Sequence, residues 1–246
     1  MKTIDTEESN NMNQIILDTK ELFKDFQHPW FICGGYALDM FAGEQLRTHG
    51  DFDISAFREH KVEMLQFLQS KGWNLYARFL DLNDADTHGT LYKVGDPIDS
   101  KWATCTNFWP VKGEDSFWRF VPHPKTEDAY TFQLNGDRTT GQIELNVIEL
   151  EFNEQTDGYY LLDKPNISRI MDKAILYHND IPYLAPEIVL FYKSDPWYAT
   201  NASQKAKSLK DYENILPLLP EESKIWLQEA ILTTYPNGDN WLAELF

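Results

Sequence analysis

Cysteines, long apolar runs and basic residues are all scarce in this sequence. Two cysteines in 246 residues, Cys33 and Cys105, cannot build a disulfide framework and do not have zinc-ligand spacing. No run of 18 or more apolar residues is present, so we expect no membrane-spanning helix. The 22 basic residues are outnumbered by 39 acidic ones, and the resulting net charge of −17 disfavours binding to nucleic-acid phosphates.

The remaining composition is that of a globular protein. Hydrophobic residues make up 42% of the chain, and eight tryptophans and fifteen phenylalanines supply material for a core. Residues 1–14 lack the apolar segment of a signal peptide, so we expect a cytoplasmic protein. The acidic surface would attract a cationic small molecule, although high net charge also favours solubility by itself.

Residue periodicity predicts an α+β fold. In the N-terminal part we expect helices at 9–26, 36–43 and 60–71, and strands at 30–33, 51–57, 73–79 and 141–152. Residues 80–140 predict an antiparallel extension with long loops and short strands near 90–94, 103–108, 117–121 and 129–134. A turn at 153–158 and a hairpin partner follow, and from about residue 165 the pattern is helical. The order predicts an α+β domain over 1–164 and a helical domain over 165–246.

Asp51 and Asp53 share one face of a predicted strand whose other face is apolar. Carboxylates two positions apart on a strand lie within about 7 Å of each other and repel. Mg²⁺ accepts one or two carboxylates together with phosphate oxygens, so the pair predicts a magnesium site. Two solvated aspartates on an exposed strand are the alternative.

Gly34 and Gly35 fall where a predicted strand turns into a helix. Glycines there let backbone N–H groups approach a ligand, and the positive end of the helix suits phosphate. Arg47 could hold triphosphate oxygens or clamp a carboxylate, and His49 could contact phosphate or support metal ligands. An ordinary tight turn and a loop histidine without a role are the alternatives.

Two stretches resemble a known family. "GGYALDMFAGEQLRTHGDFD" resembles the pattern G-G-(W/Y)-A-x-D-x-x-x-G-x-x-x-R-x-H-x-D-x-D of small bacterial aminoglycoside and lincosamide nucleotidyltransferases, which belong to the polymerase-beta-like superfamily. Residues 183–194 and 207–219 resemble the C-terminal helices of the same family, with Ser208 where an aspartate is usual. The matching positions of the first stretch are Gly34, Gly35, Tyr36, Ala37, Asp39, Gly43, Arg47, His49, Asp51 and Asp53.

The resemblance implies a polymerase-beta-like nucleotidyltransferase core followed by a helical domain. It also implies an Mg²⁺-dependent enzyme with two metal ions, which transfers a nucleoside monophosphate, AMP in the first instance, from a nucleoside triphosphate to a small-molecule hydroxyl. An aminoglycoside-like antibiotic would fit the acidic surface as acceptor. By resemblance, Asp51 and Asp53 bind metal and Gly34 and Gly35 line the triphosphate. Lys193 and Lys207 would lie against the phosphates, with solvated lysines as the alternative.

A third carboxylate should come from a neighbouring strand. Glu149 is the first candidate and Glu151 the second, because both face one way on a strand otherwise built from apolar residues. One of them would be the third metal ligand or the general base that takes the hydroxyl proton. The family more often uses aspartate here, and Glu144 stays an alternative.

Two other classes were weighed against this enzyme. A glycosyltransferase with a DxD pair would need a longer doubly wound domain than the fifty residues before Asp51 provide. A non-catalytic, antitoxin-like protein of the same fold would be marked by loss of the third carboxylate, for which candidates exist here. The sequence favours the enzyme, predicts no nucleic-acid or membrane partner, and leaves open whether it is a monomer or a homodimer.

Overall fold

The computed structural model describes residues 6–79, 90–98, 100–113, 118–124, 127–134, 145–164, 166–200, 202–237 and 240–241. The chain divides into two compact units, which are described separately: Met1–Trp30 with Thr48–Asn153, and Phe31–Arg47 with Glu154–Phe246. The predicted division at residue 164 partitions the chain differently and stays a prediction. Among the described residues, no helix combines the length and apolar character needed to cross a membrane.

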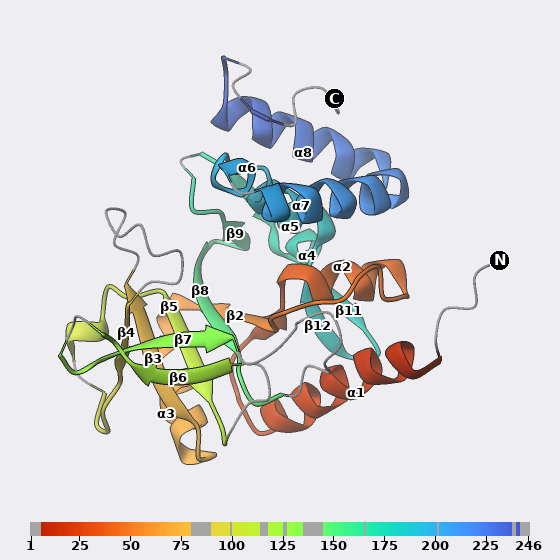
Figure 1. Ribbon diagram of the computed structural model, residues 1–246. Coiled ribbons are helices and arrows are strands. Elements are labelled where there is room, and N and C mark those ends of the chain that lie inside the picture. Colours follow the sequence, from red (N-terminus) through yellow and green to blue (C-terminus); the bar gives the residue numbers. More distant parts are fainter. Residues whose placement is uncertain are drawn as a thin grey trace. The chain divides into compact units, whose positions relative to one another are not determined.

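The first unit is built around a sheet with the strand order β2-β8-β5-β3-β4-β7-β6 (Figure 1). β2 and β8 pair in parallel, and every other neighbouring pair in this series is antiparallel. α3 packs against β2 and β3. The elements are α1 (Thr6–Phe23), β2 (Asp53–Phe57), η1 (Arg58–His60), α3 (Lys61–Ser70), β3 (Asn74–Phe79), β4 (Thr90–Lys93), η2 (Ser100–Trp102), β5 (Asn107–Val111), β6 (Trp118–Pro122), β7 (Ala129–Leu134) and β8 (Glu149–Thr156), whose end belongs to the second unit.

The second unit combines short strands with helices. β1 pairs in parallel with β12, β12 pairs antiparallel with β11, and β9 lies between β8 and β10. α5 packs against α2, α7 and α8. The elements are β1 (Trp30–Ile32), α2 (Gly34–Ala42), β9 (Tyr159–Leu161), β10 (Ser168–Ile170), α4 (Met171–Ala174), β11 (Ile175–His178), β12 (Ile181–Leu184), α5 (Pro186–Lys193), α6 (Trp197–Thr200), α7 (Ala202–Ile215), η3 (Leu216–Leu218) and α8 (Glu221–Thr234).

The predicted α+β class is confirmed, and the antiparallel extension within 80–140 is present as β4 to β7. β5 begins at Asn107 rather than near residue 103. The reason is the buried ammonium group of Lys61, which donates to the carbonyl oxygens of Trp102, Ala103 and Cys105. Those carbonyls are satisfied by a side chain and therefore do not need a strand partner.

The strand predicted at 141–152 is shifted toward the C-terminus. β8 begins at Glu149 and continues to Thr156, whereas residues 145–148 form a turn and one isolated bridge, and 141–144 lie outside the described residues. The hairpin turn is therefore shorter than predicted. It consists of Asp157 and Gly158, with φ of 46° and 82°, the left-handed pair that two-residue hairpins favour.

The prediction of helix from residue 165 is wrong for its first part. β10, β11 and β12 occupy most of 168–184, and the first long helix after them begins with Pro186 at its N-terminal turn. β10 and β11 pair with neighbours close in sequence, β9 and β12, but all three strands are only three or four residues long and carry little pattern. β12 also pairs with a strand distant in sequence. Tyr183 in β12, for example, pairs with Ile32 in β1, a contact that no local pattern reveals.

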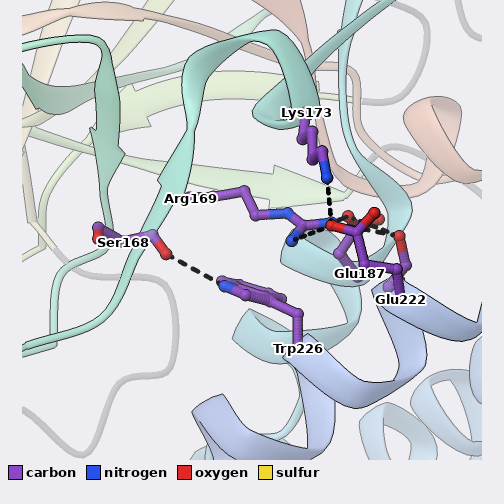
Figure 2. Close-up of polar contacts among 7 residues, drawn as sticks. Ser168, Arg169, Lys173, Glu187, Glu222 and Trp226 are labelled. Carbon is purple, nitrogen blue, oxygen red and sulfur yellow. Dashed lines mark hydrogen bonds and ion pairs between the residues drawn. The ribbon is translucent and has the colours of Figure 1, made fainter.

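A buried ion pair joins β10 to α5 in the second unit (Figure 2). The Nη2 of Arg169 lies 2.7 Å from Oε1 of Glu187, and the same oxygen accepts the hydroxyl of Ser223 at 2.9 Å. Arg169 and Glu187 are both buried. The guanidinium lies 5.1 Å from the ring centroid of Trp226, whose indole N–H donates to the Ser168 carbonyl at 3.1 Å. The network fastens α5 and α8 to the strand.

Candidate active site

The carboxylates of Asp51, Asp53 and Glu149 converge in the first unit. Each offers one oxygen, and these oxygens all lie within 4.8 Å of one another. The strand register explains this, because Asp53 stands opposite Glu149 in the parallel β2–β8 pair. Asp51 precedes Asp53 by two positions, which brings it to the same face. The Glu149 amide donates to the Phe52 carbonyl at 2.9 Å and continues the pairing there.

Burial of the opposite face holds this register. Ile54 and Leu150 face each other in the β2–β8 pair and are fully buried, and Phe52 beside them is 1% exposed. A slip of one residue would turn these side chains outward and bury the carboxylates instead. The apolar residues of both strands therefore position the acidic ones.

Burial raises the pKa of Glu149 to about 7, and the nearby charges of Glu151 and Asp51 act in the same direction. Arg78 and Asn107 oppose this effect because they favour the charged carboxylate. The Arg78 Nη1 lies 3.6 Å from Oε1 of Glu149, and the Asn107 amide donates to that oxygen at 2.8 Å. Glu149 is thus a half-buried carboxyl group held in place by one hydrogen bond and one ion pair.

Sequence reasoning missed Asn107, Arg78 and Trp109, which support Glu149. The Trp109 indole N–H donates to Oδ1 of Asn107 at 2.9 Å, so the amide nitrogen is the group turned to Glu149. Trp109 is buried, as is Trp102, so both aromatics belong to the core. No motif marks the three residues, because their roles depend on pairing between β3, β5 and β8.

The second candidate carboxylate, Glu151, is exposed and stands opposite Ser55 in β2. It does not join the three-carboxylate group among the described residues. Glu144 lies outside the described residues. The structure brings Glu149 to the two aspartates, and its role as third metal ligand or general base stays a prediction. His49 belongs to the same unit and is 4% exposed.

Two predicted phosphate-binding cations meet one carboxylate in the second unit. Arg47 binds Asp211 through both oxygens, with Nε–Oδ1 at 2.8 Å and Nη2–Oδ2 at 3.1 Å. The Nζ of Lys193 lies 3.0 Å from Oδ2 of the same residue. Burial alone would raise the pKa of Asp211, but the hydrogen bond from Arg47 and the charge of Lys193 outweigh burial and lower it. Two cations therefore share the carboxylate of Asp211.

The glycine pair begins α2 in the second unit. Gly34 has φ of 60°, a left-handed conformation that favours glycine, and follows the extended Cys33. The helix thus begins two residues earlier than predicted and ends at Gly43, as expected. Asp39 is fully buried, and its Oδ1 accepts the Leu46 amide at 3.0 Å, which fixes the loop that carries Arg47.

The predicted site residues therefore form two groups, one in each unit. The first unit holds Asp51, Asp53 and Glu149 together, with Glu151 and His49 also in that unit. The second holds Arg47 and Lys193 together around Asp211. The other predicted residues of the second unit are Gly34, Gly35 and the half-buried Lys207 of α7.

Replacing Glu149 by glutamine should flatten the pH dependence of stability in metal-free protein. The pKa of about 7 lies above the ordinary glutamate value of about 4.3, so the folded chain binds more protons between these values. The free energy of unfolding of the wild type therefore falls as pH rises through this window, by an amount on the order of 3 kcal/mol. Chemical denaturation of both proteins in EDTA between pH 5 and 8 measures how the free energy of unfolding depends on pH. Equal pH slopes for both proteins would contradict the raised pKa.

Residues 15–89 match the model of the aminoglycoside-2''-adenylyltransferase family. The matched segment contains the glycine pair, Arg47, His49 and both aspartates, so the predicted resemblance to this type of nucleotidyltransferase is confirmed for that part of the chain. A comparison with curated proteins gave no match.

Several solved structures are similar to this chain. The antibiotic-resistance factor ANT(2'')-Ia in solution is 14% identical, with 95% of each chain covered and a TM-score of 0.48. The lincomycin-bound lincosamide antibiotic adenylyltransferase LnuA is 14% identical, with 82% of this chain and 94% of that chain covered and a TM-score of 0.45. An antigenic nucleotidyltransferase-like protein from Paracoccidioides brasiliensis is 15% identical, with 94% and 91% covered and a TM-score of 0.43.

Proposed function

We propose that the protein is a nucleotidyltransferase that transfers a nucleoside monophosphate, AMP in the first instance, from a nucleoside triphosphate to a hydroxyl of a small molecule. The observation that carries the proposal is the convergence of Asp51, Asp53 and Glu149 within 4.8 Å. The family match over residues 15–89 includes the two aspartates and supports an aminoglycoside-like acceptor. The net charge of −17 is consistent with a cationic acceptor.

The three carboxylates fit Mg²⁺. Their donor atoms are all oxygens, which hard divalent cations prefer. Burial and the charges of Glu151 and Asp51 disfavour the ionised form of Glu149, and a cation between the carboxylates would relieve that cost. When bound, Mg²⁺ supplies charge neutralisation for the triphosphate and favours in-line displacement at phosphorus. Two ions are the expected number.

The remaining residues bind and orient the substrates in this proposal. Asn107 and Arg78 hold Glu149 in position, and Glu149 either ligates the metal or accepts the proton of the acceptor hydroxyl. Arg47 and Lys193, which meet at Asp211, are proposed to contact phosphate oxygens. Backbone N–H groups at the start of α2, near Gly34 and Gly35, offer further donors to phosphate. Lys207 is proposed to lie against the phosphates, and His49 to contact phosphate or to support the metal ligands.

A substrate screen tests the proposal. The protein is incubated with Mg²⁺, each of the four nucleoside triphosphates and a panel of aminoglycosides and lincosamides. We expect pyrophosphate release with at least one pair, and an acceptor whose mass has grown by one nucleotidyl group, that is, a nucleoside monophosphate less one water. Reactions without acceptor or with EDTA are the controls. Absence of release with every pair, together with no nucleotide-dependent thermal shift, would rule the proposal out.

The same screen, extended by a panel of nucleotide sugars, separates the alternatives. A thermal shift with nucleotide but no turnover would indicate a non-catalytic, antitoxin-like protein of this fold. Release of a nucleoside diphosphate from a nucleotide sugar would indicate a glycosyltransferase. Size-exclusion chromatography with light scattering decides between monomer and homodimer.

A further inference from the structure

A second group of metal-ligating side chains lies in the first unit. His28 follows α1, His60 is the last residue of η1, and Glu63 stands in the first turn of α3. One ring nitrogen from each histidine and one oxygen of Glu63 all lie within 4.8 Å of one another. The histidines are half-buried and Glu63 is exposed, so solvent reaches the group. None of the three belongs to the carboxylate site.

Apolar contacts bring these residues together. The Phe26 ring lies 5.1 Å from that of Phe67 in α3, and it meets the His28 ring edge-on at 5.5 Å. The His28 ring in turn stacks on that of His60, with centroids 3.9 Å apart and planes inclined by 18°. Aromatic packing therefore docks the segment after α1 on α3 and sets both imidazoles side by side.

We propose that His28, His60 and Glu63 form a site for Zn²⁺ or a similar transition-metal ion. Imidazole nitrogens combined with a carboxylate suit zinc, cobalt and nickel, whereas Mg²⁺ takes oxygen ligands. Glu59 lies beside the group and adds negative charge to it, because its Oε1 is 3.5 Å from Nε2 of His60. The set differs in ligand chemistry from the oxygen-only carboxylates, so the two sites should select different ions.

Metal capture requires a small rearrangement. In a tetrahedral zinc site with bonds of about 2.0–2.1 Å, neighbouring ligand atoms lie roughly 3.4 Å apart. The three donor atoms here lie within 4.8 Å of one another, so they have to approach more closely. The exposed Glu63 carboxylate can move inward to shorten these distances. A ligated metal also lies in the plane of each imidazole, so one ring has to turn out of the stack. The positive end of α3 opposes a cation there, and Glu59 and Glu63 supply the compensating negative charge.

A bound ion would tie the segment after α1 to η1 and α3. Residues 24–29 are otherwise held by aromatic contacts and by the exposed ion pair between Lys71 and Asp25, 3.1 Å apart. A ligand that binds only the folded state stabilises it by a free energy that grows with the logarithm of the ligand concentration above Kd. The site is therefore a stabilising device of the first unit, and it does not depend on the proposed transferase activity.

Cobalt titration of the full-length chain tests the site. With Mg²⁺ in excess to occupy the carboxylates, we expect one equivalent of Co²⁺ to give the intense visible absorption of four-coordinate cobalt. The double variant His28→Asn, His60→Gln should lose this absorption and bind Co²⁺ at least about tenfold more weakly. Glu63→Gln should weaken Co²⁺ binding without affecting folding, since Glu63 is exposed. Zn²⁺ should raise the unfolding temperature of the wild type but not that of the histidine double variant.

Two controls make the result specific. His178→Gln changes an exposed histidine of β11 and should bind Co²⁺ like the wild type. Asp51→Asn with Asp53→Asn should also keep the cobalt absorption. The proposal is overturned if no four-coordinate spectrum appears at saturating Co²⁺. It is equally overturned if Glu63→Gln and the histidine variant both bind like the wild type, or if the spectrum depends on the aspartates instead.

Discussion

Replacing Asp51 and Asp53 together by asparagine should lower nucleotidyl transfer at least about 10³-fold and leave the metal-free protein no less stable. Loss of metal-assisted charge neutralisation removes several kcal/mol from transition-state stabilisation, and each 1.36 kcal/mol is a factor of ten in rate. The fold should tolerate the change, because Asp51 is exposed and its charge disfavours ionised Glu149 nearby. Pyrophosphate release and thermal unfolding in EDTA measure the two effects.

A loss of activity without a loss of stability distinguishes a metal-binding role of the two aspartates from a structural one. Glu229→Gln, which neutralises an exposed carboxylate of α8, is the matched control and should change neither quantity. Retained turnover in the double variant would place the reaction elsewhere. A large fall in the unfolding temperature without metal would instead mean that the aspartates hold the fold together.

Replacing Glu187 by leucine should destabilise the protein by about 3–5 kcal/mol, because it leaves the buried Arg169 guanidinium without its closest carboxylate. For a chain of this size the unfolding temperature should fall by roughly 6–20 °C. The double variant Arg169→Met, Glu187→Leu should recover most of the loss, since it removes both charges and keeps apolar volume beside Trp226 (Figure 2). Denaturant and thermal unfolding of the three variants measure this.

An exposed ion pair of the same unit provides the comparison. Lys164→Met breaks the contact between Lys164 and Asp195, 3.1 Å apart and about one-third exposed, and should change stability by no more than about 1 kcal/mol. If Glu187→Leu had an equally small effect, water would have to reach Arg169. A double variant as unstable as the single one would show that packing, rather than an unpaired charge, causes the loss.

Local sequence patterns determined much of the candidate site. The alternation around Asp51 and Asp53 placed both carboxylates on one strand face, and the same period placed Glu149 and Glu151 together opposite Leu150. The glycine pair was expected between a strand and a helix, and α2 begins there. These features were predictable because side-chain direction along a strand, and the end of a helix at Gly43, depend on neighbours within a few residues.

Tertiary structure alone decided which of these residues meet. The parallel register of β2 and β8 sets Asp53 opposite Glu149, and burial of Ile54 and Leu150 fixes it. Arg47 was predicted to hold phosphate or clamp a carboxylate, and the structure pairs it with Asp211, 164 residues further on. Strand β12 was missed in part for the same reason, because it pairs with the distant β1. Pairing between distant segments is stabilised by burial that no local sequence pattern reveals. The sequence therefore predicted which residue types form the site, and only the tertiary structure determined which of them contact each other.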